Sequence, residues 1–228
     1  MKLRRFLKDI FDNLRKRQYS YVTNSIAKKC PDWLLKYNKA SLMYTDTFSF
    51  PKSNQNGIIV KAADKSDIDD IIRISGLAKV KAIGLLDEGA TCYLASRHGN
   101  KPESISWETH GKCYIRGLGF KYDFQKDGTY TFWSVTSPEA RSQGLHNALI
   151  TYRAQQAFDQ GLHKFYCFIE FDNKISSDIR VRTGYQAIAE IVYLRFLFFN
   201  TTITKDILTG KRSFVFFLFR NTKDFMII

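Results

Sequence analysis

One segment of this chain joins a strand pattern to a helix pattern through a short loop that contains a glycine. Residues 129–136 are mostly β-branched or aromatic, as is typical of a strand, and Pro138 ends that strand because proline cannot donate to a sheet ladder. Apolar residues then recur at helical spacing over 145–158, which predicts a helix that begins near Gln143 and ends at Gly161. The free N–H groups and the positive dipole end at the start of such a helix are suited to bind a pyrophosphate.

A second segment combines a strand end with a helix at a fixed spacing. The pattern predicts a strand over 163–170, which leads to Asn173. Ser176 stands three positions beyond this asparagine, and Gly184 and Tyr185 stand eleven and twelve positions beyond it. Taken with the first segment, this order resembles the GNAT superfamily of CoA-dependent N-acetyltransferases, in which a small residue and Gly-Phe/Tyr follow a strand-ending asparagine at these positions.

The loop over 141–146 is also similar to the phosphate loop of that family, which reads Arg/Gln-x-x-Gly-x-Gly/Ala. Arg141, Gly144 and His146 stand at its defined positions. His146 departs from the pattern, because a small residue there usually lets the backbone approach the pyrophosphate. Two alternatives stay open for its side chain: it points outward, or it adds a hydrogen bond to a phosphate.

The resemblance covers roughly residues 57–220 and implies an α+β fold, an α/β three-layer arrangement of the GNAT type. It implies a central mixed, mostly antiparallel sheet of six to seven strands, with helices on both faces and an N-terminal amphipathic helix in addition. Residues 1–56 are then a basic amphipathic helical extension and connector, and residues 57–228 are a GNAT-like acetyltransferase domain. A chain of 228 residues, of which 44% are hydrophobic, can bury one ample core.

The remaining patterns predict further elements of this domain. An opening strand over 57–63 precedes a capped helix from Asp67 to about Leu77. The expected later elements are strand segments at 91–96, 104–107 and 113–116, and an antiparallel hairpin of the aromatic runs 185–199 and 213–219 around Thr209-Gly210. The pattern over residues 30–56 predicts an irregular or short-helical connector.

The resemblance also implies which residues bind acetyl-CoA as the co-substrate. In the family, the strand before the loop splays from its neighbour and offers backbone groups to the pantetheine arm. The loop amides hold the pyrophosphate, and the asparagine bonds the pantetheine amide. The positions of this sequence that match are Ser134, Val135, Thr136, Arg141, Ser142, Gln143, Gly144, Leu145, His146 and Asn173.

The catalytic groups are left unassigned by the sequence. Many family members place a tyrosine seven residues after the asparagine, as general acid for the CoA thiolate, and Arg180 stands there in this chain. Arginine stays protonated, so it can stabilise a thiolate or bind a phosphate but cannot donate a proton in the ordinary way. The strand over 129–136 holds no carboxylate, which leaves Glu108, Glu170 or a chain of water molecules as the base.

Cysteine usage gives no sign of a metal site or of disulfides. The four cysteines are scattered without a CxxC motif or Cys/His spacing, so no metal is expected. Cys92, Cys113 and Cys167 lie in apolar strand patterns and are interpreted as small buried hydrophobic residues. We expect a reducing, cytoplasmic location.

The N-terminus is basic and amphipathic. Leu3, Phe6, Leu7, Ile10, Phe11 and Leu14 follow helical spacing, and residues 1–29 carry nine Lys/Arg against two Asp, or +7 of the net charge of +13. This helix packs on the domain or on a second subunit, or residues 1–17 lie on the inner face of a membrane. Nucleic acid is not expected as a partner, since the charge is concentrated in this one helix and no nucleic-acid-binding signature accompanies it.

Together these patterns predict a CoA-dependent N-acetyltransferase that works by direct attack of an amine on the bound thioester. The acceptor is not identified by the sequence; a small-molecule or sugar amine fits the resemblance best, and a homodimer stays open. The alternative is a non-catalytic CoA-binding or scaffold module with the same fold, suggested by Arg180 at the position of the usual acid.

Overall fold

The computed structural model describes residues 15, 19–31, 34–49, 57–115, 120–124, 126–196, 199–218 and 226–227. Its main feature is a nine-stranded sheet with the strand order β11-β10-β9-β1-β8-β7-β4-β3-β2. Every neighbouring pair is antiparallel except β7 and β8, which are parallel. The expected α+β fold with a mixed, mostly antiparallel sheet is therefore confirmed, although the sheet has nine strands rather than six to seven.

The strands of this sheet are β1 (Leu35–Thr45), β2 (Ile58–Ala62), β3 (Thr91–Arg97), β4 (Ser104–His110), β7 (Gly128–Thr136), β8 (Lys164–Glu170), β9 (Gln186–Phe196), β10 (Phe199–Asp206) and β11 (Arg212–Leu218). A small second sheet contains β5 (Lys112–Ile115), β6 (Phe120–Asp123) and β12 (Met226–Ile227). The α-helices are α2 (Tyr19–Ala27), α3 (Ile68–Ser75), α4 (Lys79–Asp87), α5 (Leu145–Asp159) and α6 (Lys174–Arg182).

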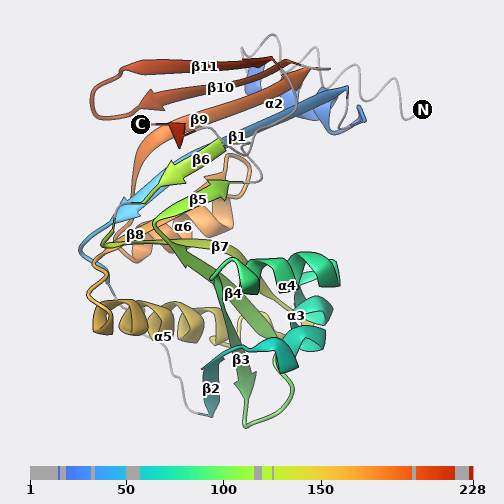
Figure 1. Cartoon of the computed structure of the whole chain (residues 1–228), viewed down its shortest axis with the longest axis vertical. Coiled ribbons are helices and arrows are strands. Elements are labelled where there is room, and N and C mark those ends of the chain that lie inside the picture. Colours follow the sequence, from blue (N-terminus) through green and yellow to red (C-terminus); the bar gives the residue numbers. More distant parts are fainter. Residues whose placement is uncertain are drawn as a thin grey trace.

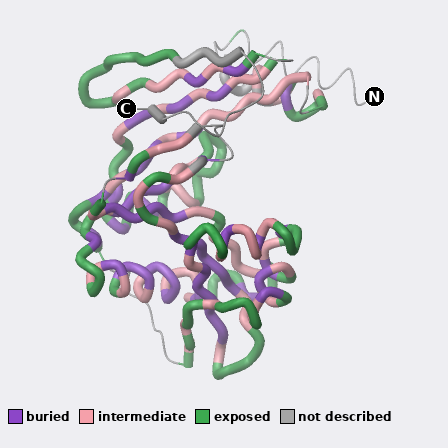
Figure 2. The backbone as a smooth tube through the Cα atoms, viewed as in Figure 1, coloured by how far each residue is buried: buried purple, intermediate pink, exposed green. Residues whose placement is uncertain are grey.

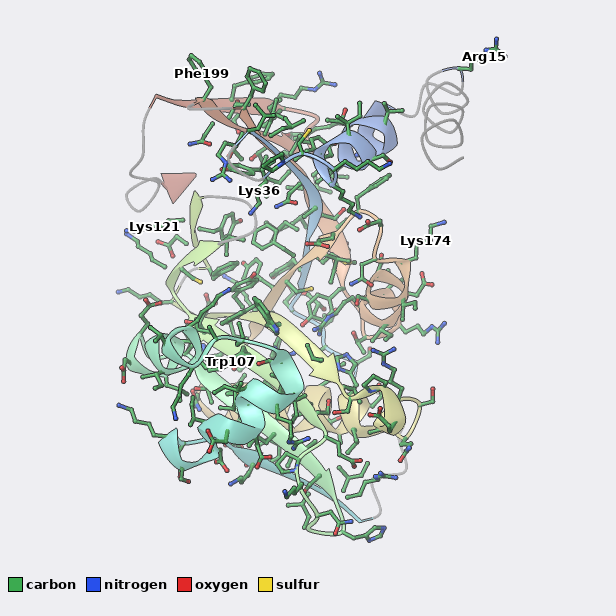
Figure 3. All side chains as sticks on the ribbon, turned by 90° about the vertical axis from the view of Figure 1, so that its right-hand side faces the viewer. Arg15, Lys36, Trp107, Lys121, Lys174 and Phe199 are labelled. Atoms are coloured by element: carbon green, nitrogen blue, oxygen red, sulfur yellow. The ribbon has the colours of Figure 1, made fainter. Side chains whose placement is uncertain are left out.

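The helices form layers on both faces of the sheet (Figure 1). Helices α3 and α4 cover one face of β3, β4 and β7, where Trp107 is fully buried among their apolar side chains. Figure 3 shows Trp107 inside this half of the molecule, with α5 and α6 on the opposite side of the sheet. Buried residues concentrate in β3, β4, β7 and α5, whereas the turn between β10 and β11 is exposed (Figure 2).

Strand β1 corrects the expected connector over 30–56. Instead of an irregular or short-helical segment, Leu35–Thr45 forms an eleven-residue strand in the middle of the sheet. It is hydrogen-bonded to β8 on one side and to β9 on the other, and Ala40, Leu42 and Met43 are buried. The local pattern gave no signal, because polar residues alternate irregularly there and only the partners far along the chain make it a central strand.

Two further expectations needed correction. Helix α4 was not predicted, since its apolar residues do not repeat regularly and Gly84 interrupts them. The aromatic runs 185–199 and 213–219 do not pair with each other, because β10 lies between β9 and β11 and pairs with both. The turn at Thr209-Gly210 is confirmed, but it joins β10 to β11; Asp206 Oδ1 accepts from the Thr209 amide at 2.7 Å. Phe219 and Arg116 lie outside the described residues.

The predicted elements around the loop are confirmed with small shifts of their ends. Strand β7 is followed by a short 3-10 helix at Pro138–Ala140, and α5 begins two residues later than expected, at Leu145. The predicted helix after Asp67 is α3, and Asp64 caps the turn before it by accepting from the Ser66 amide at 2.7 Å. Residues 1–14 and 16–18, which carry the predicted N-terminal helix, lie outside the described residues.

Candidate functional site

Strands β7 and β8 separate in the middle of the sheet. They pair only from Gly128–Lys164 to Thr131–Cys167. Beyond this point β7 continues along β4 to Thr136, while β8 continues along β1 to Glu170. Since no strand is inserted between them, the edge of β7 over 132–136 that faces β8 has backbone groups free for a ligand.

A β-bulge in β7 lies where the strands separate. Opposite β4, Ile105 pairs with Val135 and Trp107 pairs with Phe132, so β7 has one extra residue in this step. Trp133 takes a φ of 48°, a left-handed conformation that is uncommon for a tryptophan. Bulges of this kind bend a strand and re-aim its groups, and they are frequent next to active sites.

The predicted pantetheine contacts Ser134, Val135 and Thr136 all lie on this bent half of β7. The hydroxyl groups of Ser134 and Thr136 bond those of Ser106 and Ser104 on β4, at 2.8 and 2.7 Å. These bonds use the side chains and hold the strand against β4. A ligand on the other edge would therefore meet the backbone of these residues.

The loop after β7 ends in an anion-binding geometry. Ser142 and Gly144 both adopt left-handed conformations, with φ of 61° and 83°, and Gly144 is the N-cap of α5 without a side-chain cap. The first helical bond is from the Ala148 amide to the Gly144 carbonyl, at 2.9 Å. Within the described residues, nothing accepts from the amides of 145–147, which point out of the helix start.

Side chains hold this loop in place from β3. Gln143 donates to the Glu139 carbonyl at 2.8 Å and accepts from Arg97. Arg97 in turn forms two bonds of 2.8 Å with Glu103. Arg97 was not among the predicted site residues, because its position at the end of a distant strand gives no local signal. Arg141 is exposed beside the loop, with its charge available to a phosphate.

His146 lies in the first turn of α5. Its side chain is partly buried, and burial together with the nearby charges of Arg180 and Arg153 lowers its pKa to about 4. The imidazole is therefore neutral near pH 7, and an outward orientation stays a prediction. A hydrogen bond to a phosphate stays a prediction.

Asn173 lies at the other side of the separated strands. It is exposed, and its Oδ1 caps α6 by accepting from the Ser176 amide at 3.1 Å. The Nδ2 donor remains for a ligand. Asn173 thus combines the role of an ordinary helix cap with a position just after β8, the strand that separates from β7.

A buried polar cluster lies behind the loop, between α5, α6 and the sheet. Arg153 and Glu108 are fully buried and form an ion pair of 3.0 Å. Arg180 is 5% exposed, and its guanidinium lies 5.1 Å from the ring centroid of Tyr185. Glu108 is held by Arg153, so it is a structural acid. The other candidate base, Glu170, is exposed at the end of β8.

No group of three or more His, Cys, Asp or Glu side chains that could hold a metal ion is found in the described part of the chain. Cys92 and Cys167 are buried and Cys113 packs against the core, as expected for small hydrophobic residues, and burial raises the pKa of the Cys92 thiol. The helices of the described residues include none long and apolar enough to cross a bilayer.

Solved structures with a similar architecture include one protein assigned to the GNAT acetyltransferases and one of unknown function. A protein from Novosphingobium aromaticivorans assigned to the GNAT acetyltransferases has a TM-score of 0.51 and 14% identity, over 69% of this chain and 63% of that one. A conserved protein of unknown function from Staphylococcus epidermidis has a TM-score of 0.52 and 10% identity, over 70% and 61%. In both cases, the match spans less than two thirds of the other protein's length. No protein-family model matches the sequence, and no curated protein sequence does.

The chain therefore has the GNAT fold, as its motifs suggested. At identities of 10 to 14%, this likeness establishes the fold alone, and the reaction has to be argued from the site itself.

Proposed function

We propose that the protein is an acyl-CoA-dependent N-acetyltransferase, in which an amine attacks the thioester of acetyl-CoA directly. One observation carries the proposal: β7 leaves β8 after Thr131, and its free edge leads straight to the open N-terminus of α5. An extended ligand that ends in a pyrophosphate matches this arrangement, since the strand edge offers backbone bonds and the helix start offers N–H groups to an anion.

The residues present fit CoA. The amides of 145–147 and the charge of Arg141 would hold the pyrophosphate, and the backbone of 134–136 would bind the pantetheine arm. The Nδ2 group of Asn173 would bond an amide of that arm. Within the described residues, these donors have no hydrogen-bond partner that a ligand would have to displace.

Acetyl-CoA supplies an activated acyl group as its thioester. The free N–H groups of β7 are placed to polarise the thioester carbonyl, because they are fixed by the β4 pairing before the ligand arrives. Among the described residues of β7 no side chain is a carboxylate, and Glu108 is bound to Arg153. Glu170, which is exposed at the end of β8, and a chain of water molecules are then the candidates for removal of the amine proton.

The second candidate is a non-catalytic CoA-binding or scaffold module. It is favoured by Arg180, which stands where many members of the family carry a tyrosine as general acid. Arginine stays protonated, so Arg180 cannot protonate the thiolate in the ordinary way. A screen of small-molecule and sugar amines for release of the CoA thiol separates the two: turnover supports the enzyme, and binding without turnover supports the module. A cytoplasmic location, a homodimer and the absence of a nucleic-acid partner remain predictions.

The substitution Gly144→Glu tests the site. A side chain and a negative charge at this N-cap would occupy the position of the pyrophosphate, so calorimetry should show affinity for acetyl-CoA at least about tenfold weaker. Gly89→Glu is the matched control, because Gly89 has a φ of 84°, close to the 83° of Gly144, and open space around it. Normal binding by a folded Gly144→Glu protein would reject the proposal.

A further inference from the structure

The polar cluster behind the loop contains more hydrogen-bond donors than acceptors. Nη1 of Arg180 is buried and has no partner within the described part of the chain, and the same holds for the hydroxyl group of Thr131. Arg153 interacts with the Tyr185 hydroxyl as well as with Glu108, but Nε and Nη2 of Arg153 have no hydrogen bond of good geometry. Buried donors are nearly always paired in folded proteins, so an acceptor is missing here.

The same cluster carries an unmatched positive charge. Glu108 neutralises Arg153, but no carboxylate among the described residues is paired with Arg180. His146 adds no charge near neutral pH, because its pKa is lowered to about 4. A buried guanidinium without a counter-ion is costly, and an anion bound beside it removes that cost.

This charge lies at the point where β7 and β8 separate. Thr131 and Cys167 are the last paired residues of the two strands, and Glu108 pairs with Thr131 across β4. Arg153 reaches this point through its ion pair with Glu108, and Arg180 lies 5.1 Å from the ring centroid of Tyr185, which packs in the same core cluster as Cys167. The unmatched donors are thus next to the opening in which a thioester would lie.

We propose that this cluster binds the terminal carboxylate of a dicarboxylic acyl group, so that the donor is a CoA thioester of the malonyl or succinyl type. The inference rests on the CoA-dependent transfer to an amine proposed above and extends its donors from acetyl-CoA to thioesters that end in a carboxylate. A carboxylate supplies the negative charge that Arg180 lacks and acceptor oxygens for the remaining donors of the two arginines. The amine nitrogen forms an amide bond with the acyl carbon, the carbon–sulfur bond breaks, and one proton passes from the amine through water to the leaving thiolate.

Two inert CoA thioethers of equal chain length test this inference in the full-length protein. S-butyl-CoA ends in a methyl group, and S-(3-carboxypropyl)-CoA ends in a carboxylate at the same reach. In calorimetry the carboxylate compound should bind about tenfold tighter or more, as expected for a buried charged hydrogen bond. This comparison uses the unmodified chain, so it does not depend on whether any variant folds.

The variant Arg180→Gln should reduce the ratio of the two affinities to about one, and Arg180→Lys should keep part of it because the charge remains. Arg182→Gln is the matched control, since Arg182 is exposed on the same helix and should leave the ratio unchanged. Melting curves check that each variant is folded.

The outcomes separate the inference from the proposed function. Equal affinity for the two thioethers in the unmodified protein overturns the inference but leaves CoA binding intact. A ratio that survives Arg180→Gln, with weaker binding of free CoA alone, assigns Arg180 to the thiolate and also overturns it. Failure of acetyl-CoA, free CoA and both thioethers to bind rejects the proposed function together with the inference.

Discussion

At the residue scale, Gly128 is required for a reason that its sequence context hides. It begins β7 and pairs with Lys164 of β8, and the carbonyl oxygen of Phe124 occupies the position that a Cβ atom would take. The neighbour is backbone, so it cannot rotate away. The β5–β6 hairpin is thereby packed directly against the strand that carries the site, with Phe124 stacked on Tyr130 at 4.6 Å.

Gly128→Ala should lower the free energy of unfolding by about 1–3 kcal/mol, the usual cost of forcing atoms into a packed site. Gly84→Ala is its control: Gly84 lies in α4 with nothing within 4 Å, and alanine there should stabilise the helix by about 0.5–1 kcal/mol. Urea unfolding of both proteins measures the two opposite shifts. A Gly128→Ala protein as stable as the unmodified chain would show that the contact is not as close as described.

His146 predicts a specific dependence of stability on pH. Its pKa falls from 6.5 to about 4 on folding, so between these values the unfolded chain binds a proton that the folded chain does not. The free energy of unfolding therefore rises with pH across this window. It falls by up to about 3 kcal/mol as the pH drops towards 4. Urea unfolding from pH 4 to 7 should show a shallower slope for His146→Asn. Equal slopes would mean that the imidazole is not buried beside the two arginines.

At the element scale, β1 is the strand on which the sheet depends. It joins the half that contains β8 and the site to the half formed by β9, β10 and β11, and its residues Ala40, Leu42 and Met43 are buried. A strand in this position cannot be removed without exposing backbone groups and apolar area on both neighbours.

A chain that begins at residue 31 keeps β1 and should retain a cooperative thermal transition, at a lower temperature because α2 is missing. A chain that begins at residue 50 loses the strand and should not fold. Far-ultraviolet circular dichroism and melting curves compare the two. Cooperative unfolding of the shorter chain would show that the sheet closes without β1.

At the scale of the whole molecule, the sheet is covered unevenly. Its lower half in Figure 1 has helices on both faces. In the last strands, three aromatic side chains are at least half exposed: Phe196 by 50%, Phe199 by 57% and Phe214 by 57%. Phe199 pairs with Phe196, and Ile203 pairs with Phe214, so all three aromatic side chains belong to one face. Figure 3 shows Phe199 at the end of the molecule.

Such a surface favours packing of residues 1–17 on the protein over membrane contact, although that segment itself lies outside the described residues apart from Arg15. We expect a chain that begins at Tyr19, which keeps α2 and β1, to melt at a lower temperature than the full chain. Neither chain should sediment with anionic vesicles. Vesicle binding that disappears on truncation and weakens with salt, with an unchanged melting temperature, would favour the membrane instead.

The sequence by itself determined the local parts of the site. Pro138 and Gly144 mark the end of β7 and the start of α5, and the spacing from Asn173 to Gly184 marks α6, because proline, glycine and capping residues act on their own stretch of backbone. The GNAT fold followed from these short motifs. The predicted CoA contacts cluster along one path for the same reason.

Only the tertiary structure decided what depends on partners distant in the chain. The place of β1 between β8 and β9, the clamp of Arg97 on Gln143 and the burial of Glu108 against Arg153 each join residues from separate elements. Arg180 is the clearest case: its sequence position shows only that an acid is absent, whereas its burial without a counter-ion makes it a candidate anion site. Burial and charge pairing are properties of the assembled core, which local patterns do not contain.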